Sequence, residues 1–291
     1  MATTYLVLGA TGMLGSACLK IFAADGSTVF GTVRSFGALD LFPDAVRPNL
    51  IVGVDAADMD SVAHAFEVSR PDVVVNCIGM VKQLAQSKDP LVALPLNALF
   101  PHRLMRLCGA TGARLVHVST DCVFTGDAGL YSESDRPDAD DLYGVSKRLG
   151  EVDALHAITL RTSIIGHELT GSRSLIDWFL SQQGPVNGFT KAVFSGLPTV
   201  ELAAVIRDHV VPRPELHGLY HVSAQPIDKF TLLTLVAEAY GKTVEIVPSE
   251  SLVIDRSLNS DRFRTATGWS PAPWPELVAR MRALTPGAET R

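Results

Sequence analysis

Long apolar runs, paired cysteines and an excess of basic residues are all missing from this 291-residue sequence. No uninterrupted apolar stretch reaches the roughly 18 residues that a membrane-spanning helix needs. The net charge of −6 and a pI near 5.7 give no basic footprint for nucleic acid. The first residues lack the basic segment and apolar core of a secretory signal. We therefore expect a cytoplasmic protein that binds neither nucleic acid nor a membrane.

Metal-binding and disulfide patterns are also missing. The four cysteines are scattered without a Cys-x-x-Cys pair, and no histidine cluster stands at metal-ligand spacing. Scattered thiols suit a reducing compartment. The sequence predicts no metal site. With 47% apolar residues, a chain of this length can bury a full core as one large domain or two coupled ones.

Short apolar runs alternate with helical patterns through the first half of the chain. Strands are predicted over residues 4–9, 28–33, 50–54, 72–77, 114–119 and 157–162. Helices are predicted over residues 13–24, 58–69, 90–111 and 143–156, with the third broken near Pro95 or Pro101. This alternation predicts an α/β fold with a Rossmann-type, doubly wound parallel sheet that is covered on both faces.

The rhythm changes after about residue 165, where glycine and proline become frequent. A helix over 200–210, a strand over 218–223, a helix over 229–240 and a strand over 244–247 follow. We expect a smaller C-terminal α/β unit interleaved with the first. The predicted first domain comprises residues 1–165 and roughly 200–223, and the predicted second domain comprises roughly 166–199 and 224–291.

A glycine-rich turn follows the first predicted strand. Gly9, Gly12 and Gly15 allow a tight turn, a close approach of the backbone to a pyrophosphate, and a helix N-terminus whose amides attract anions. A purely structural turn is the alternative. On the first interpretation, the first domain binds a dinucleotide. Its contacts in the turn also include Thr11, Met13 and Leu14.

The end of the second predicted strand indicates which dinucleotide the chain binds. An NAD site usually offers an acidic residue there, whereas this chain has Arg34 followed by Ser35. A guanidinium can pair with a 2′-phosphate, so NADP(H) is favoured over NAD(H), unless Arg34 is a solvated surface residue. Asp55 could accept a hydrogen bond from the adenine or serve only its own turn. The other predicted cofactor contacts are Ala56, Cys77, Ile78, Gly79 and Asn97.

Tyr143 and Lys147 lie four residues apart in a predicted helix, so the phenol and the ammonium share one face. The lysine charge favours the phenolate and is expected to lower the tyrosine pKa from its reference of about 10. Such a tyrosine can exchange a proton near neutral pH. The strand over 114–119 leads into Thr120 and Asp121 at the carboxyl edge of the sheet, where doubly wound folds bind ligands. Ordinary turn chemistry is the alternative for this strand end.

Together these features resemble the extended short-chain dehydrogenase/reductases, and most of all the dTDP-4-dehydrorhamnose reductase group. The resemblance runs through nearly the whole chain. Its matching segments are residues 9–15, 76–79, 119–124, 143–151, 160–163, 196–199 and 258–263.

The resemblance implies a role for each catalytic residue. Thr120 would orient a keto oxygen, Tyr143 would donate the proton, and Lys147 would hold the nicotinamide ribose. The implied reaction is the NADPH-dependent reduction of the C4 keto group of a nucleotide-linked 4-keto-6-deoxy sugar, in deoxysugar or glycan biosynthesis. The protein would be a monomer or a homodimer. Besides Thr120 and Tyr143, the predicted contacts to the nucleotide-diphosphate sugar are Lys82, Asp121, Cys122, Trp178, Lys191 and Arg256.

Two departures from the family pattern leave alternatives open. Cys122 replaces the usual aromatic residue, and related dehydratases carry a glutamate there, so dehydration is disfavoured while 4-epimerisation is not. The segment over 166–195, with His167 and Glu168, has no clear counterpart, and we expect substrate choice to depend on it. The resemblance also extends to the regulatory β subunit of methionine adenosyltransferase, so a non-catalytic NADP-binding subunit is a further alternative.

Overall fold

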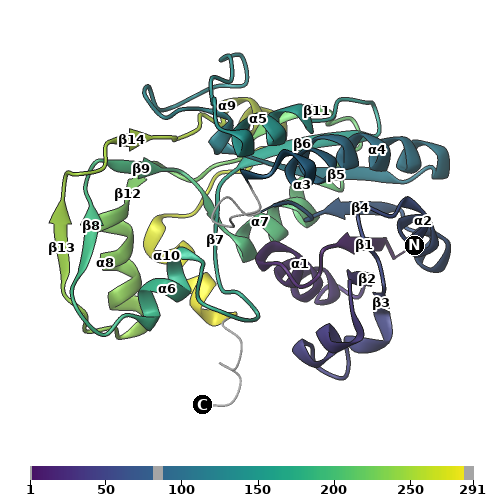
Figure 1. The fold of residues 1–291 in the computed structure, drawn as a ribbon, viewed down its shortest axis with the longest axis horizontal. Coiled ribbons are helices and arrows are strands. Elements are labelled where there is room, and N and C mark those ends of the chain that lie inside the picture. Colours follow the sequence, from purple (N-terminus) through teal and green to yellow (C-terminus); the bar gives the residue numbers. More distant parts are fainter. Residues whose placement is uncertain (1, 81–87, 285–291) are drawn as a thin grey trace.

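The computed structural model describes residues 2–80 and 88–284. Its centre is a seven-stranded sheet with the order β3-β2-β1-β4-β5-β6-β11, in which all neighbouring strands are parallel (Figure 1). The strands are β1 (Thr4–Leu8), β2 (Thr28–Val33), β3 (Leu50–Val52), β4 (Val73–Asn76), β5 (Arg114–Thr120), β6 (Ala157–Thr162) and β11 (Gly218–His221). The predicted α/β fold with a doubly wound parallel sheet is confirmed.

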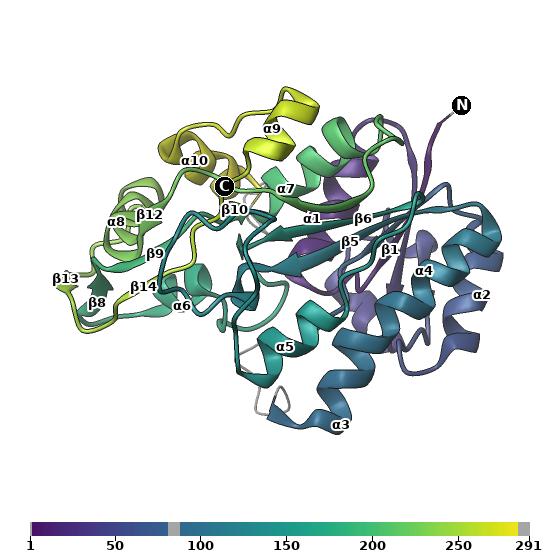
Figure 2. The same ribbon diagram turned by 90° about the horizontal axis from the view of Figure 1, so that it is seen from above.

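Helices cover both faces of this sheet (Figure 2). Side chains alternate along each strand, so Tyr5 and Val7 enter one core while Leu6 and Leu8 enter the other. The first core is completed by α1 (Met13–Ala23) and by α7 (Thr199–Val205) with its π-helical continuation η6 (Ile206–Val210). The second core is completed by α2 (Met59–Ser69) and α4 (Phe100–Thr111). Burial on both faces explains why the central strands β1 and β4 are mostly apolar.

The long helix predicted over 90–111 is not broken at either proline. It runs through α3 (Pro90–Ala93), a wider π-helical segment η4 (Leu94–Leu99) and α4. Pro95 falls near the start of η4, and Pro101 falls in the first turn of α4. The missing proline N–H is tolerated at such positions, because the chain can widen there without losing its direction.

The helix predicted over 143–156 is shorter than expected. The helix α5 (Leu142–Leu149) ends at Gly150, where a Cβ atom would overlap the carbonyl oxygen of Asn97 in η4. The chain then turns so that Glu151 can reach the neighbouring strands β5 and β6. Packing against η4 and this buried carboxylate therefore end the helix earlier than its sequence pattern indicates.

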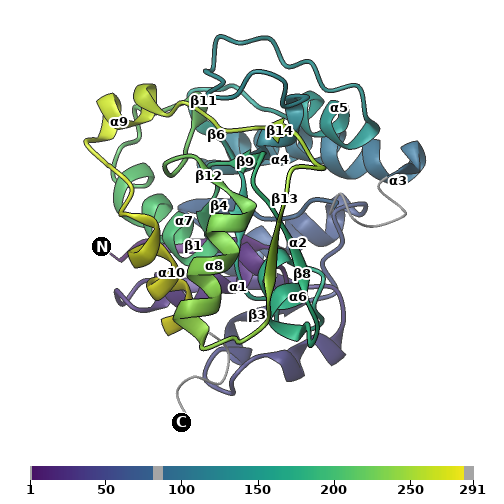
Figure 3. The same ribbon diagram turned by 90° about the vertical axis from the view of Figure 1, so that its left-hand side faces the viewer.

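A small lobe stands beside the carboxyl edge of the sheet, on the left of Figure 1 and facing the viewer in Figure 3. Its strand β13 pairs with β8, and β9 pairs with both β12 and β14. The lobe comprises α6 (Leu175–Ser181), β8 (Val186–Phe189), β9 (Ala192–Phe194), β12 (Ile227–Asp228), α8 (Lys229–Tyr240), β13 (Ile246–Ser249) and β14 (Ile254–Asp255). The remaining elements are β7 (Ile164–Ile165), β10 (Leu197–Pro198), α9 (Asp261–Thr267) and α10 (Trp274–Ala283).

The chain returning from the lobe is joined to the loop that follows β5. Asp255 N donates to Gly126 O (2.7 Å), and Tyr131 N donates to Ser257 O (2.9 Å). Asn259 N then donates to Tyr131 O (2.8 Å). These bonds fix the lobe against the strand end that carries Thr120.

The sequence pattern divided the chain at about residues 165, 199 and 223, and we keep that division as a proposal. The strand β11 extends the large sheet beside β6, and α7 packs on α1. Both elements come from residues assigned to the first domain. In the part of the chain that the structure describes, no helix is long and apolar enough to cross a membrane.

Candidate active site

The glycine turn has the geometry of an anion-binding loop. Gly9 adopts a positive φ of 82°, and Gly12 N donates to Gly9 O (3.1 Å). Gly12 is the N-cap of α1, and no side chain caps this helix. A Cβ atom on Gly15 would overlap the carbonyl oxygen of Gly9. The turn therefore needs glycine at positions 9 and 15, and it leaves the first amides of α1 available to a diphosphate.

Candidate contacts for the rest of the cofactor follow the neighbouring strands. Arg34 and Ser35 are exposed directly after β2, where a guanidinium can reach a phosphate. Asp55 follows β3 but already accepts a hydrogen bond from Ala57 N (2.9 Å), so its local turn uses one carboxylate oxygen. Ala56 beside it is buried. The residue types at this edge fit a dinucleotide, and an exposed guanidinium such as that of Arg34 can pair with a 2′-phosphate.

The segment after β4 lies between the glycine turn and the catalytic helix. A Cβ atom on Gly9 would contact Ile78 and the backbone of Cys77. A Cβ atom on Gly79 would stand 3.7 Å from Lys147 Nζ and 3.7 Å from Asn97 Oδ1. The structure thus brings together the residues after β4 that the sequence assigned to the cofactor.

Asn97 is buried, and its side chain supports this arrangement through hydrogen bonds within the protein. Its Oδ1 accepts a hydrogen bond from Met80 N (2.9 Å), and its Nδ2 donates to Ser146 Oγ (3.0 Å) on α5. Both ends of the buried amide thus form hydrogen bonds. Asn97 therefore joins the segment after β4 to the helix α5.

Thr120 and Tyr143 come together at the carboxyl edge of the sheet. Thr120 ends β5, and a side-chain hydrogen bond joins it to Tyr143. Burial raises the pKa of Tyr143, the neighbouring Cys122 and Asp121 raise it further, and the bond to Thr120 lowers it. The phenol therefore keeps its proton at neutral pH.

Lys147 does not have the expected effect on this tyrosine. Its Nζ donates to Val118 O (2.8 Å), and the pKa of Tyr143 is raised rather than lowered, with burial as the largest cause. Burial lowers the pKa of Lys147 to about 8, while the charge of Glu151 raises it. The prediction that Lys147 lowers the Tyr143 pKa is thus wrong for the protein alone, because desolvation dominates.

A buried ion pair supports the catalytic strand end. Glu151 accepts hydrogen bonds from Arg161 Nε and Nη2, both at 2.6 Å, and from Ser119 Oγ at 2.8 Å. Ser119 immediately precedes Thr120, and Glu151 closes the helix that carries Lys147. The carboxylate therefore fixes β5, β6 and the end of α5 relative to one another.

The predicted substrate side of the site begins at Asp121 and Cys122. Asp121 is only 5% exposed, and burial raises its pKa, whereas the Cys122 thiol, the charge of Arg256, the Thr120 hydroxyl and the charge of Lys229 lower it. Arg256 donates to Phe124 O from Nε (2.8 Å) and approaches Cys122 Sγ from Nη1 (3.8 Å). The small lobe therefore places cations against the catalytic strand end.

The other predicted substrate residues are not tied to this cluster. Lys191 forms an exposed ion pair with Glu250 (2.7 Å). Trp178 lies on α6 with 38% of its surface exposed. Lys82 lies outside the described residues. The sequence could not place Lys191 and Trp178, because the small lobe, not local spacing, decides what they face.

Lys229 is the residue that sequence reasoning missed. The sequence pattern predicts only that a helix begins at Lys229, whereas in the structure Lys229 opens α8 within reach of the Asp121 charge. Burial lowers its pKa, while the charge of Asp121 raises it. One signal was available, because a lysine in the first turn opposes the helix dipole and needs another reason to be there.

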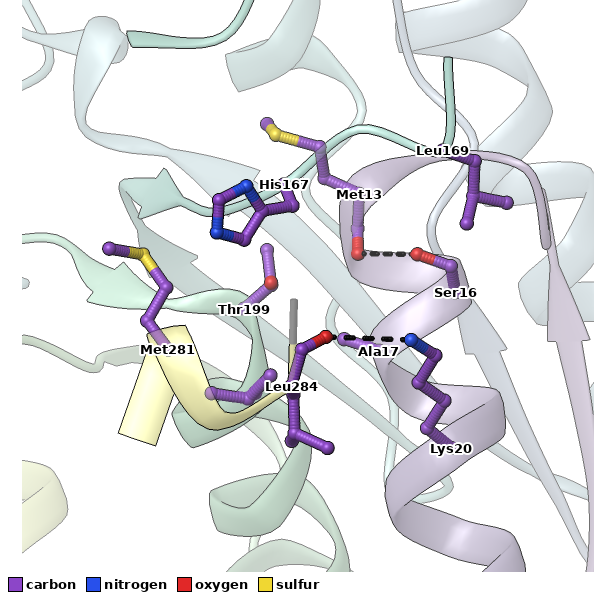
Figure 4. Close-up of a pocket in the computed structure, with 10 residues that line it drawn as sticks. Met13, Ser16, Ala17, Lys20, His167, Leu169, Thr199, Met281 and Leu284 are labelled. Carbon is purple, nitrogen blue, oxygen red and sulfur yellow. Dashed lines mark hydrogen bonds between the residues drawn. The ribbon is translucent and has the colours of Figure 1, made fainter. Parts of the chain in front are cut away.

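His167 and Glu168 serve the segment before α6. His167 forms hydrogen bonds with Asp177 Oδ1 (2.6 Å) and the Tyr240 hydroxyl (2.8 Å). Figure 4 shows His167 over a crevice between α1, α7 and α10. Of the proposed site residues, only Met13 lines this crevice. It therefore borders the glycine turn at Met13.

Sequence comparisons relate the chain to reductases and to a subunit of another enzyme. Residues 3–281 match the family model described as RmlD substrate binding domain. The dTDP-4-dehydrorhamnose reductase of Streptomyces griseus is 32% identical over 155 residues, which are 53% of this chain and 45% of that protein. Thus the alignment spans less than half of that relative.

Two further relatives align over most of the chain. The probable low-salt glycan biosynthesis reductase Agl14 of Haloferax volcanii is 31% identical over 272 residues, covering 89% of this chain and 85% of that protein. Methionine adenosyltransferase 2 subunit beta of Xenopus tropicalis is 27% identical over 294 residues, covering 94% and 79%.

A solved structure supports the fold. The dTDP-4-dehydrorhamnose reductase of Bacillus anthracis, determined in complex with NADP, superposes with a TM-score of 0.78 at 18% identity. The superposition covers 97% of this chain and 99% of that one.

Proposed function

Because the chain belongs to the RmlD substrate binding domain family, we propose that it is an NADPH-dependent reductase of nucleotide-linked 4-keto-6-deoxy sugars. The observation that carries the proposal is the contact between Thr120 and a protonated Tyr143 at the sheet edge. Two hydroxyls there can hold one keto oxygen, and the one with the acidic proton can release it.

The chain's own groups divide the work. Thr120 orients the keto oxygen, and the phenol of Tyr143 gives its proton to that oxygen as the alcohol forms. The glycine turn holds the diphosphate of the cofactor, Arg34 its 2′-phosphate, and Lys147 its nicotinamide ribose. When bound, NADPH supplies the hydride for the keto carbon. Asp121, Cys122 and Arg256 form the wall beside the sugar.

The proposal is tested by mixing the purified protein with NADPH or NADH and a panel of dTDP-, GDP-, UDP- and CDP-linked 4-keto-6-deoxy sugars. The absorbance of the cofactor is followed. We expect NADPH to be oxidised with one nucleotide series, which also names the nucleotide. If the cofactor binds but is not oxidised with any of these sugars, the reductase proposal is wrong.

A non-catalytic NADP-binding subunit is the second candidate, favoured by the alignment with methionine adenosyltransferase 2 subunit beta over 94% of this chain. The variant Tyr143→Phe separates the two. A reductase should lose roughly 10²- to 10⁴-fold in rate, the usual contribution of a positioned proton donor, and should keep its affinity for NADPH. A binding subunit should lose neither its NADPH affinity nor its effect on a partner enzyme.

A further inference from the structure

A series of buried hydrogen bonds leads from the catalytic strand end to His221, the last residue of β11. Glu151 accepts from Ser119 and from Arg161, and Arg161 also donates from Nη1 to His221 Nε2 (3.3 Å). The sheet register allows this last bond, because His221 lies directly opposite Arg161 on the neighbouring strand. His221 has no exposed surface. The polar groups behind Thr120 thus continue to the edge strand of the large sheet.

The partners of His221 fix which ring nitrogen carries the proton. Nδ1 lies 2.9 Å from Tyr131 O, and a carbonyl oxygen can only accept, so Nδ1 is the donor. The Arg161 guanidinium can only donate, so Nε2 accepts. Burial, followed by the charge of Arg161, lowers the pKa of His221 to about 4. The ring is therefore neutral at pH 7 and has one tautomer.

His221 holds the loop that follows β5 at two points. Besides the bond from its ring to Tyr131 O, its backbone N donates to Glu133 Oε1 (2.7 Å). The ring of Phe124, in the same loop, stacks on that of Tyr131 with centroids 4.1 Å apart and meets the His221 ring edge-on at 6.0 Å. The loop therefore leaves the sheet at Thr120 and is joined to it again at β11.

The residues between these two points include those proposed to face the sugar. Asp121 and Cys122 immediately follow Thr120. Phe124 O accepts a hydrogen bond from Arg256 Nε (2.8 Å), so the position of the loop also decides where Arg256 lies. Most of the predicted cofactor contacts follow β1, β2, β3 and β4 instead. A shift of the loop would therefore displace the substrate contacts and leave the cofactor contacts in place.

We propose that His221 is a positioning residue for the proposed reduction, on which this inference rests. Arg161 holds the imidazole as the Nδ1–H tautomer, and the imidazole holds the carbonyl of Tyr131. The loop over residues 121–133 then keeps the sugar aligned with Thr120. Alignment matters because a displacement of about 1 Å can cost roughly 100-fold in rate. A histidine that only stabilised the fold would leave the turnover of the folded protein unchanged.

Three variants of the full-length protein separate positioning from stability. His221→Leu removes both hydrogen bonds of the ring, whereas His221→Asn keeps a donor near the place of Nδ1. Val222→Ala is the matched control, because Val222 is fully buried in the first core and its truncation leaves a cavity without changing a polar group.

Four quantities are measured for each variant. They are the kcat/KM for the sugar that the panel identifies, the dissociation constant of NADPH, the melting temperature, and the hydrogen exchange of residues 126–135 by mass spectrometry. The last of these reports how firmly the loop is held and needs no turnover.

We expect His221→Leu to lower kcat/KM roughly 10- to 100-fold and to leave NADPH affinity unchanged. Exchange in the loop should become about 10-fold faster, as for one lost hydrogen bond. His221→Asn should recover most of both. Val222→Ala should lower the melting temperature while it keeps wild-type turnover and loop exchange. Wild-type turnover in His221→Leu would overturn the proposal, as would a failure of His221→Asn to recover it or an equal loss in Val222→Ala.

A measurement on the wild-type protein covers the case in which His221→Leu does not fold. Nitrogen-15 NMR of labelled histidine at pH 7, with the His221 signals assigned from their loss in His221→Asn, should show a neutral ring with its proton on Nδ1. A proton on Nε2, in either a neutral or a charged ring, would overturn the proposal.

The two proposals can fail separately. If no sugar oxidises NADPH but the loop loosens in His221→Leu and not in Val222→Ala, the reductase proposal is wrong and the hold of His221 on the loop stands. If His221→Leu reduces a sugar as well as the wild type does, the reductase stands and His221 is not a positioning residue.

Discussion

Two ion pairs show how differently the sheet edge and the small lobe are built. The side chains of Arg161 and Glu151, beneath the catalytic strand end, are 4% and 13% exposed. Those of Lys191 and Glu250, on the lobe, are 51% and 69% exposed. The first pair is bidentate and also holds Ser119, whereas the second spans a single contact. The pair beneath the strand end is thus enclosed by the fold, whereas the pair on the lobe is exposed to solvent.

The largest expected effect is the loss of the buried pair. Arg161→Met leaves the mostly buried Glu151 carboxylate with Ser119 as its only remaining side-chain partner among the residues that the structure describes. We expect a loss of about 3–5 kcal/mol in the free energy of unfolding, measured by urea denaturation. The double variant Arg161→Met/Glu151→Met should recover part of this loss. A loss below about 1 kcal/mol in the single variant would mean that the buried ion pair stabilises the protein no more than an exposed pair does.

A second variant tests the exposed guanidinium after β2, at the edge of the large sheet. Arg34→Ser removes the exposed guanidinium after β2 and should weaken NADPH binding by about 1.5–3 kcal/mol, or roughly 10- to 100-fold. NADH binding, measured in parallel by fluorescence, is the control and should hardly change, since NADH lacks the 2′-phosphate. Equal losses for both cofactors would show that Arg34 supports the turn instead.

Lys147 tests whether a buried charge at the sheet edge lowers the stability of the folded protein. Its pKa falls from an ordinary value of 10.5 to about 8, so the folded protein binds fewer protons than the unfolded chain between these values. Stability contributed by this group therefore rises as the pH increases from about 8 to 10.5 and is lost on returning below 8.

Lys147→Met removes this buried charge. After the lost bond to Val118 is counted, we expect the variant to be more stable by about 1–2 kcal/mol at pH 7. Thermal denaturation at pH 7 and pH 10 measures the gain, which should shrink at the higher pH. The same variant should lose reductase activity. An equally large gain at both pH values would contradict the role of the charge.

The smallest effect is expected on the lobe surface. Lys191→Met removes one partner of an exposed pair and should change the free energy of unfolding by less than about 1 kcal/mol. Urea denaturation under the conditions used for Arg161→Met gives the direct comparison. A change as large as that of Arg161→Met would show that the lobe is held more firmly than its exposure indicates.

The large sheet could be predicted because each of its strands carries its own signal. Runs such as residues 73–75 are apolar on both faces, and the glycine turn marks where the first strand ends. The strands of the lobe have two to four residues and pair with partners far along the chain. No local alternation develops over so few residues, so only the later strand β13 was predicted, with shifted ends.

The candidate site also has a part that the sequence predicts and a part that it does not. Thr120, Tyr143 and Lys147 follow from a strand end and a helical spacing, so the sequence could bring them together. Their electrostatics could not be predicted, because burial outweighs the charge of Lys147. Lys229 was missed for a related reason. Only the docking of the lobe places the start of α8 beside Asp121.

The junction between residues 126–131 and 255–259 also sets an order of assembly during synthesis. A ribosome releases the glycine turn and the catalytic helix more than a hundred residues before the segment that closes the loop after Thr120. The nascent chain can thus build most of its cofactor-binding framework early, since domains tend to form from the N-terminus onward. The loop after Thr120 is closed only when residues 255–259 have emerged.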